Sequence, residues 1–190
     1  MSEKNWITEM KGMNLPNRLT LLRIALVPFY LVCLWYSKTV PGLSWAALAL
    51  FAVASLTDLF DGKIARKYHL ITNFGKFMDP IADKLLTHPA FIMMLALGRL
   101  NVLSCILFIS REFVVAGIRL LAAERGIVIA AGMSGKVKTV LQMVLVILLT
   151  VNLPALEMVS RIVEIGAVVM TLVSMIEYAV KNRSVFSEEE

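Results

Sequence analysis

Six long apolar stretches constrain the fold of this chain more than any other feature of its sequence. They cover residues 19–38, 43–61, 77–98, 102–122, 136–153 and 158–180. A helix needs about 20 residues to cross a hydrocarbon core roughly 30 Å thick, and each stretch has about that length. Short connections with turn residues such as Gly98 and Pro154 separate the stretches. The pattern predicts an all-α, polytopic integral membrane protein with six transmembrane helices.

The composition supports this class of protein. Hydrophobic residues make up 58% of the 190 residues and charged residues only 17%, whereas a soluble domain is about half apolar and roughly a quarter charged. We therefore predict a single membrane domain over residues 1–190. Cys33 and Cys105 lie in apolar stretches, so we expect buried thiols and no disulfide. Membrane topology and anionic lipid head groups explain the net charge of +5, and we expect no nucleic-acid partner.

The basic residues predict the orientation of the chain in the membrane. If the N-terminus is cytoplasmic, all of the 19 Lys and Arg residues except Lys38, Arg99, Arg111 and Arg161 fall on the cytoplasmic side. Such an excess is typical of cytoplasmic loops, so both termini are expected inside the cell. Residues 1–18 are polar with helical spacing of a few apolar side chains, which fits either an interfacial helix on the cytoplasmic leaflet or a disordered lead-in.

All four aspartates of the chain lie between residues 55 and 85. Asp58 and Asp61 are three residues apart at the cytoplasmic end of the second apolar stretch, and Asp79 and Asp83 are four apart at the start of the third. Both spacings place two carboxylates on one face of a helix. We expect residues 62–76 to form a loop that lets the two helices run antiparallel and brings the two pairs of carboxylates together.

Four carboxylates near a low-dielectric boundary repel one another unless some are protonated or a cation is bound. Short carboxylates on rigid helices suit hard divalent ions such as Mg²⁺, Mn²⁺ or Ca²⁺. The cluster contains neither Cys nor His, which argues against zinc. The alternative interpretation is a solvated cluster of acids that caps two helices at the membrane surface.

Small and basic residues around the aspartates favour the binding of a phosphorylated ligand. Gly62, Ala65 and Gly75 leave room for a ligand or another helix to approach the backbone. Arg66 carries a guanidinium whose planar set of donors matches phosphate. Carboxylates, a metal ion and an arginine at one membrane face are typical of phosphoryl chemistry on a lipid-linked diphosphate.

These residues together carry a resemblance to a known family. The stretch reads Asp58-x-x-Asp61-Gly62-x-x-Ala65-Arg66, then eight residues, then Gly75-x-x-x-Asp79-x-x-x-Asp83. It is similar to the signature of the CDP-alcohol phosphatidyltransferases. The resemblance implies six transmembrane helices around a cytoplasm-facing polar cavity, two Mg²⁺ or Mn²⁺ ions, and a homodimer. It further implies the following roles: Asp58, Asp61 and Asp79 as metal ligands, Asp83 as general base and metal ligand, and Asp58, Gly62, Ala65, Arg66 and Gly75 in binding the CDP-lipid.

Two further stretches concern the acceptor of the transferred group. In ISREFVVAGIR, Arg111 and Arg119 are eight residues apart, which is about 80° around a helix. In SGKVKT, Lys136 and Lys138 begin the fifth apolar stretch. An arginine at mid-depth in a membrane is costly and usually lines a cavity or pairs with an acid. We predict that these four residues bind the phosphate of an acceptor. Alternatively, Arg119, Lys136 and Lys138 only set the orientation of the chain.

The acidic residues within the apolar stretches are expected to pair with basic ones. Arg161 with Glu164 and Glu177 with Lys181 have the spacing of helical ion pairs. Glu112 directly follows Arg111, and neighbours on a helix diverge by about 100°, so we expect its side chain to point away from Arg111.

The two basic stretches and NLPNRLTLLR (residues 14–23) resemble the bacterial branch of the family that makes phosphatidylglycerol phosphate. The reaction implied is transfer of the phosphatidyl group from CDP-diacylglycerol to sn-glycerol 3-phosphate, with release of CMP, at the cytoplasmic membrane of a bacterium. An inositol phosphate, phosphatidylglycerol or serine is an alternative acceptor. A divalent-cation transporter or sensor is an alternative of another class, but its acids would lie near the membrane midplane on broken helices.

Overall fold

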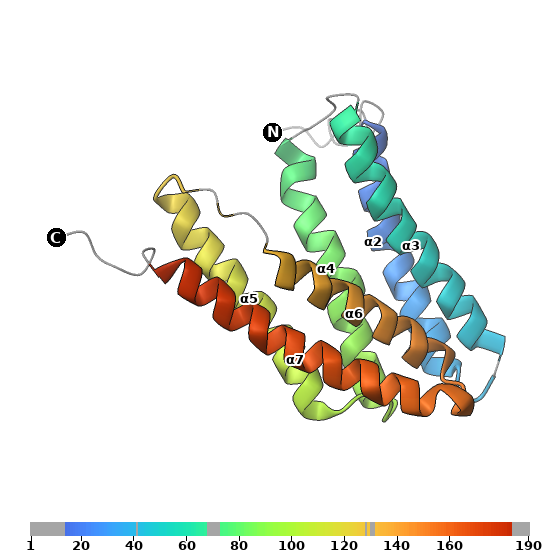
Figure 1. The fold of residues 1–190 in the computed structure, drawn as a ribbon. Coiled ribbons are helices and arrows are strands. Elements are labelled where there is room, and N and C mark those ends of the chain that lie inside the picture. Colours follow the sequence, from blue (N-terminus) through green and yellow to red (C-terminus); the bar gives the residue numbers. More distant parts are fainter. Residues whose placement is uncertain (1–13, 41, 68–72, 128, 130–131, 184–190) are drawn as a thin grey trace. The chain divides into compact units, whose positions relative to one another are not determined.

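The computed structural model describes residues 14–40, 42–67, 73–127, 129 and 132–183, with side chains for all of these except 59–67, 73–77, 79 and 80. This part of the chain contains no strand, which confirms the all-helical prediction (Figure 1). Its helices are α2 (Leu15–Tyr36), α3 (Gly42–Lys67), α4 (Asn73–Ala96), α5 (Val102–Glu124), α6 (Met133–Val151), the short 3-10 helix η1 (Pro154–Leu156) and α7 (Glu157–Lys181).

The apolar character of several of these helices fits a membrane protein. Within the described residues, Leu15–Tyr36, Met133–Val151 and Pro154–Lys181 are long and apolar enough to cross a bilayer. The apolar part of α3, Gly42–Asp58, is shorter. These findings support a membrane protein, whereas the count of six spans stays a prediction.

The boundaries of α3 and α4 differ from the expected ones. Residues 62–76 were expected to form a loop, but α3 continues to Lys67 and α4 begins at Asn73. The expectation was wrong because hydropathy reports where a helix leaves the hydrocarbon core, not where it ends. Backbone hydrogen bonds continue outside the core, and Lys63, Arg66 and Lys67 at the end of α3 have good helix propensity. Asp58 and Asp61 therefore lie within α3 rather than at its end.

The chain divides into two compact units, residues 1–90 and 91–190, and the boundary falls within α4. In the first unit, α2 packs against α3. Tyr30 and Phe51 are both buried, with ring centroids 5.5 Å apart. Ala47 and Ala54 of α3 are also buried, and such small side chains let two helices approach closely.

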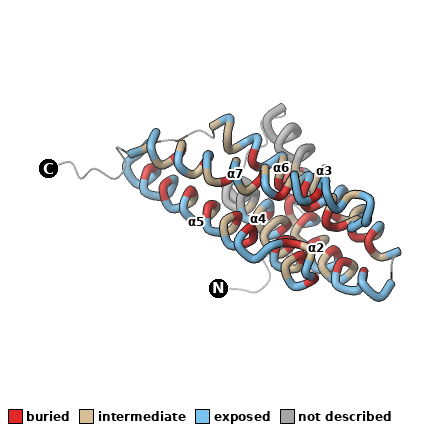
Figure 2. The backbone as a smooth tube through the Cα atoms, turned by 60° about the horizontal axis from the view of Figure 1, so that its bottom comes forward, coloured by how far each residue is buried: buried red, intermediate tan, exposed pale blue. Residues whose placement is uncertain are grey.

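In the second unit, α5 and α6 pack against α7. The buried side chains of α7 recur every three or four residues and are small or polar: Ser160, Glu164, Ala167, Thr171, Ser174 and Tyr178. Figure 2 shows these buried positions alternating with exposed ones along the helix. A seam of this kind is typical of helices that associate within a membrane through close packing and hydrogen bonds rather than through an apolar core.

Polar contacts fix both ends of this second unit. Near the start of α5, Glu164 accepts hydrogen bonds from the hydroxyl of Ser104 at 2.7 Å and from the backbone N–H of Asn101 at 3.1 Å. Glu164 also pairs with Arg161, and Glu177 pairs with Lys181, which confirms both ion pairs predicted from spacing. At the other end of the unit lies the basic cavity described below.

Candidate functional site

Asp58, the first predicted metal ligand, is held by a buried arginine. Its Oδ1 lies 2.6 Å from Nη1 of Arg23 on α2. The side chain of Arg23 has no exposed surface, whereas that of Asp58 is 44% exposed. A buried guanidinium needs a nearby counter-charge, so the ion pair orients the carboxylate while leaving it accessible. Asp58 is therefore not a freely solvated acid at the end of a helix.

The other aspartates are placed by their helices. Asp61 lies on α3, and Asp79 and Asp83 lie on α4, so each pair keeps the spacing that puts both carboxylates on one helix face. The side chain of Asp83 is exposed. The side chains of Asp61 and Asp79 lie outside the described residues, and so do those of Gly62, Ala65, Arg66 and Gly75. The meeting of the two pairs and the roles of these residues stay predictions.

The four aspartates are chemically suited to bind a hard divalent cation. All four candidate ligands are carboxylates, and the described side chain of Asp58 is both accessible and oriented. Within the described residues no group of three or more His, Cys, Asp or Glu side chains gathers at one point. The side chains of Asp61 and Asp79, two of the four candidates, are not among the described ones.

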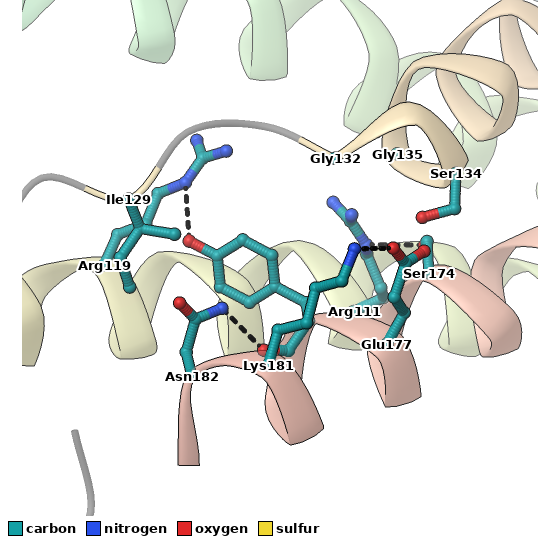
Figure 3. A pocket seen from close by; sticks show the side chains of 11 residues that line it. Arg111, Arg119, Ile129, Gly132, Ser134, Gly135, Ser174, Glu177, Lys181 and Asn182 are labelled. Carbon is teal, nitrogen blue, oxygen red and sulfur yellow. Dashed lines mark hydrogen bonds and ion pairs between the residues drawn. The ribbon is translucent and has the colours of Figure 1, made fainter. Parts of the chain in front are cut away.

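A basic cavity of about 280 Å³ lies in the second unit, where the end of α5, the start of α6 and the end of α7 come together (Figure 3). Three cationic side chains and one carboxylate take part in its lining. The full lining is Arg111, Arg119, Ile129, Gly132, Ser134, Gly135, Ser174, Glu177, Tyr178, Lys181 and Asn182. An anion with several oxygens is the kind of ligand that such a surface attracts.

Each arginine of the cavity is held by α7. Arg111 is buried, and its Nε donates to the hydroxyl of Ser174 at 3.3 Å. Arg119 donates through Nε to the hydroxyl of Tyr178 at 3.1 Å, and its guanidinium lies over the ring of the same tyrosine, 5.7 Å from the centroid. Lys181 is bonded to Glu177 on the cavity wall (Figure 3). The two guanidiniums are therefore fixed in position before any ligand binds.

The four basic residues predicted to bind the acceptor phosphate are only partly brought together. Arg111 and Arg119 line the cavity, whereas Lys136 is exposed and Lys138 is buried, and neither lines it. Lys138 is instead bonded to Glu112. The expectation that Glu112 points away from Arg111 was wrong, because Nη1 of Arg111 donates to Oε1 of Glu112 at 2.8 Å. Both side chains are long enough to bend toward each other despite the angle between their Cα–Cβ bonds.

Sequence reasoning missed Ser134, Tyr178 and Lys181 as cavity residues. From the sequence, Lys181 was expected only to lie on the cytoplasmic side and to pair with Glu177. The one available signal was the predicted topology, in which six spans of alternating direction would place the ends of α5 and α7 and the start of α6 at the same membrane face. That signal identifies the helix ends but not the side chains that point into the cavity.

The comparison with protein families defines the class of this protein. The family model of the CDP-alcohol phosphatidyltransferases matches residues 13–173, and the chain belongs to this family. The protein is therefore a transferase of the class that the aspartate motif indicated, which disfavours the transporter or sensor interpretation.

Three relatives show which enzymes of this family the chain is similar to. The chain is 44% identical over 184 residues to the CDP-diacylglycerol–glycerol-3-phosphate 3-phosphatidyltransferase of Bacillus subtilis, covering 89% of this chain and 95% of the relative. It is 38% identical to the enzyme of the same name from Rickettsia bellii, covering 87% and 93%. It is also 38% identical to a probable phosphatidylglycerophosphate synthase of Mycobacterium tuberculosis, covering 88% and 81%.

Proposed function

We propose that this protein transfers the phosphatidyl group of CDP-diacylglycerol to sn-glycerol 3-phosphate, which yields phosphatidylglycerol phosphate and CMP. The observation that carries the choice of acceptor is the cavity lined by Arg111, Arg119 and Lys181. The names of relatives that are 38% and 44% identical to the chain support the same acceptor. The proposed setting is a bacterial cytoplasmic membrane, with six spans, both termini and the active site facing the cytoplasm, and a homodimer as the assembly.

The cavity favours a small acceptor that carries a phosphate. A phosphate monoester brings up to two negative charges and three acceptor oxygens, which match guanidinium and ammonium donors. Serine carries a carboxylate and an ammonium group and so has no net charge, whereas the cavity lining has three cations and one carboxylate. A volume of about 280 Å³ suits a three-carbon phosphate better than an acceptor that is itself a diacyl lipid.

The donor would bind at the aspartates. Asp58, Asp61, Asp79 and Asp83 would hold two Mg²⁺ or Mn²⁺ ions, which when bound stabilise the charge that develops on the attacking and leaving oxygens. Gly62, Ala65, Arg66 and Gly75 would accommodate the CMP part of the CDP-lipid. Arg23 fixes the orientation of Asp58, so that its carboxylate does not have to be ordered when the donor binds.

The proposed reaction is a direct displacement. Asp83 takes the proton from the primary hydroxyl of glycerol 3-phosphate. The hydroxyl oxygen forms a bond to the phosphorus that carries the lipid, and the bond from this phosphorus to the CMP oxygen breaks. CMP leaves in line with the attacking oxygen. The sequence offers no Ser, Cys or His in a setting that would make it a covalent nucleophile.

The Arg23–Asp58 ion pair gives a prediction about metal binding. In Arg23→Gln the carboxylate of Asp58 loses its buried partner, and we expect the affinity for Mn²⁺ to fall about tenfold. Electron paramagnetic resonance of the purified protein measures free and bound Mn²⁺ without any turnover. Arg18→Gln, an exposed arginine on the same helix, is the matched control and is expected to bind Mn²⁺ as the wild type does. An unchanged affinity in Arg23→Gln would refute the positioning of Asp58 by Arg23.

The identity of the products tests the proposed function. Purified protein with CDP-diacylglycerol, glycerol 3-phosphate and Mg²⁺ is expected to form phosphatidylglycerol phosphate and CMP in equal amounts, as measured by mass spectrometry and nucleotide chromatography. Formation of CMP together with phosphatidic acid would instead identify a hydrolase, and the proposal would fail.

A further inference from the structure

Glu112 is a carboxylate to which the proposed reaction gives no role. It directly follows Arg111 on α5, and its side chain is 18% exposed. It does not line the basic cavity. Its Oε1 accepts hydrogen bonds from two cations, Nη1 of Arg111 and Nζ of Lys138 on α6. A single carboxylate oxygen thus joins two cations whose side chains are each at least nine-tenths buried.

The contacts of Arg111 leave one of its nitrogens for a ligand. Nη1 is held by Glu112 at 2.8 Å, and Nε is held by Ser174 at 3.3 Å. Within the described part of the chain Nη2 donates no hydrogen bond. It is also the nitrogen next to Gly135, since a Cβ at that residue would stand 3.3 Å from it. Arg111 and Gly135 line the same cavity, and Figure 3 shows the guanidinium reaching toward that stretch of chain.

The same carboxylate determines the position of Lys138. The ammonium of Lys138 is bonded to Glu112, its side chain is only 4% exposed, and it takes no part in the lining of the cavity. Without the negative charge of Glu112, two buried cations would repel each other at short distance. The guanidinium would then keep only its bond to Ser174 and lose the shorter of its two contacts, and the ammonium of Lys138 would lose its bond to Glu112.

We propose that Glu112 is the positioning residue of the acceptor site: it aims the guanidinium of Arg111 into the cavity and keeps Lys138 out of it. This inference rests on the proposed function, because the ligand of the cavity is taken to be the phosphate of the acceptor. Recognition of that phosphate then depends on Glu112, which does not itself contact the phosphate. A planar guanidinium that is already held in position loses less conformational freedom on binding a phosphate than a mobile ammonium does.

Glu112→Gln tests the proposal, because it keeps the shape of the side chain and removes its charge. We expect the KM for glycerol 3-phosphate to rise about 10- to 100-fold, while the Kd for CDP-diacylglycerol, measured without acceptor, stays as in the wild type. In a double-mutant cycle, Arg111→Ala is expected to raise this KM much less in the Glu112→Gln background than in the wild type. Full additivity of the two substitutions would overturn the proposal, since Arg111 would then act independently of Glu112.

Glu164→Gln is the matched control. Glu164 is likewise a carboxylate that joins two helices, α7 and α5, and it is buried. It lies at the opposite end of the unit, where it accepts hydrogen bonds from Ser104 and the backbone of Asn101. We expect Glu164→Gln to lower the Tm without changing the KM for glycerol 3-phosphate. If this variant raises the KM as much as Glu112→Gln does, the effect belongs to general destabilisation and the proposal is wrong.

These experiments distinguish a failure of the proposed function from a failure of the proposed role of Glu112. A wild-type protein that releases no CMP with glycerol 3-phosphate contradicts the proposed function itself. A wild-type protein that is active, with an unchanged KM in Glu112→Gln, contradicts only the role of Glu112. Should Glu112→Gln not fold, Glu112→Asp decides, because it keeps the charge but is one methylene too short to hold both cations. An increased KM in that variant supports the proposal, and an unchanged KM overturns it.

Discussion

Asp83→Asn is expected to lower the turnover number about 10²- to 10⁴-fold, because an amide cannot take the proton from the acceptor hydroxyl. The side chain of Asp83 is exposed on α4, so the substitution should not disturb the packing of the helices. Binding of CDP-diacylglycerol is expected to persist in part. The rate of CMP release at saturating glycerol 3-phosphate measures the first effect, and equilibrium binding of a labelled CDP-lipid measures the second.

The control for this variant is Glu157→Gln, which neutralises an exposed carboxylate in the first turn of α7. It is expected to turn over at the rate of the wild type. A turnover number for Asp83→Asn that equals that of Glu157→Gln would exclude Asp83 as the general base.

Arg111→Ala is expected to raise the KM for glycerol 3-phosphate about 100-fold, since it removes a buried charged donor from the phosphate site. The fold should survive, because Lys138 continues to pair with Glu112. Arg111→Lys keeps the charge but lacks the planar set of donors that reaches Ser174 and Glu112 together. We expect an intermediate increase of about tenfold for that variant.

Initial rates of CMP release at varied glycerol 3-phosphate measure both variants of Arg111. Arg125→Ala is the matched control, because Arg125 is an exposed arginine at the end of the same helix. A KM in Arg111→Ala that matches the KM of Arg125→Ala would remove Arg111 from the acceptor site and with it the proposed use of the cavity.

The positions of the helices could be predicted from the sequence because a helix that crosses a membrane needs about 20 consecutive apolar residues. Every apolar stretch of about 20 residues corresponds to a helix in the described part of the chain. The ends of the helices could not be predicted in the same way. α3 runs on to Lys67 through polar residues that hydropathy assigns to a loop. Outside the hydrocarbon core a helix does not need apolar residues, so hydropathy does not mark where the helix ends.

Only the part of the cavity lining that comes from a single helix could be predicted from the sequence. Arg111 and Arg119 share α5, so their helical spacing was enough to place them near one another. Their partners Ser174 and Tyr178 lie 63 and 59 residues further along the chain. Which face of α7 meets α5 depends on the packing of small and polar side chains between the helices, and no local pattern encodes it.

Lys138 shows why charge and spacing do not determine a site. Its place at the start of α6 was compatible with a side chain in the cavity, yet its ammonium is bonded to Glu112 instead. The difference depends on a contact between residues 26 positions apart, in which the partly buried carboxylate of Glu112 holds the ammonium of Lys138. Only the three-dimensional arrangement of α5 and α6 reveals that contact.

Release of CMP with several acceptors side by side determines which acceptor the protein uses. The purified protein would receive CDP-diacylglycerol, Mg²⁺ and one of four acceptors: glycerol 3-phosphate, inositol 1-phosphate, serine or phosphatidylglycerol. We predict release of CMP with glycerol 3-phosphate alone. Release with serine or phosphatidylglycerol, and none with glycerol 3-phosphate, would contradict the assignment of the basic cavity to the acceptor phosphate.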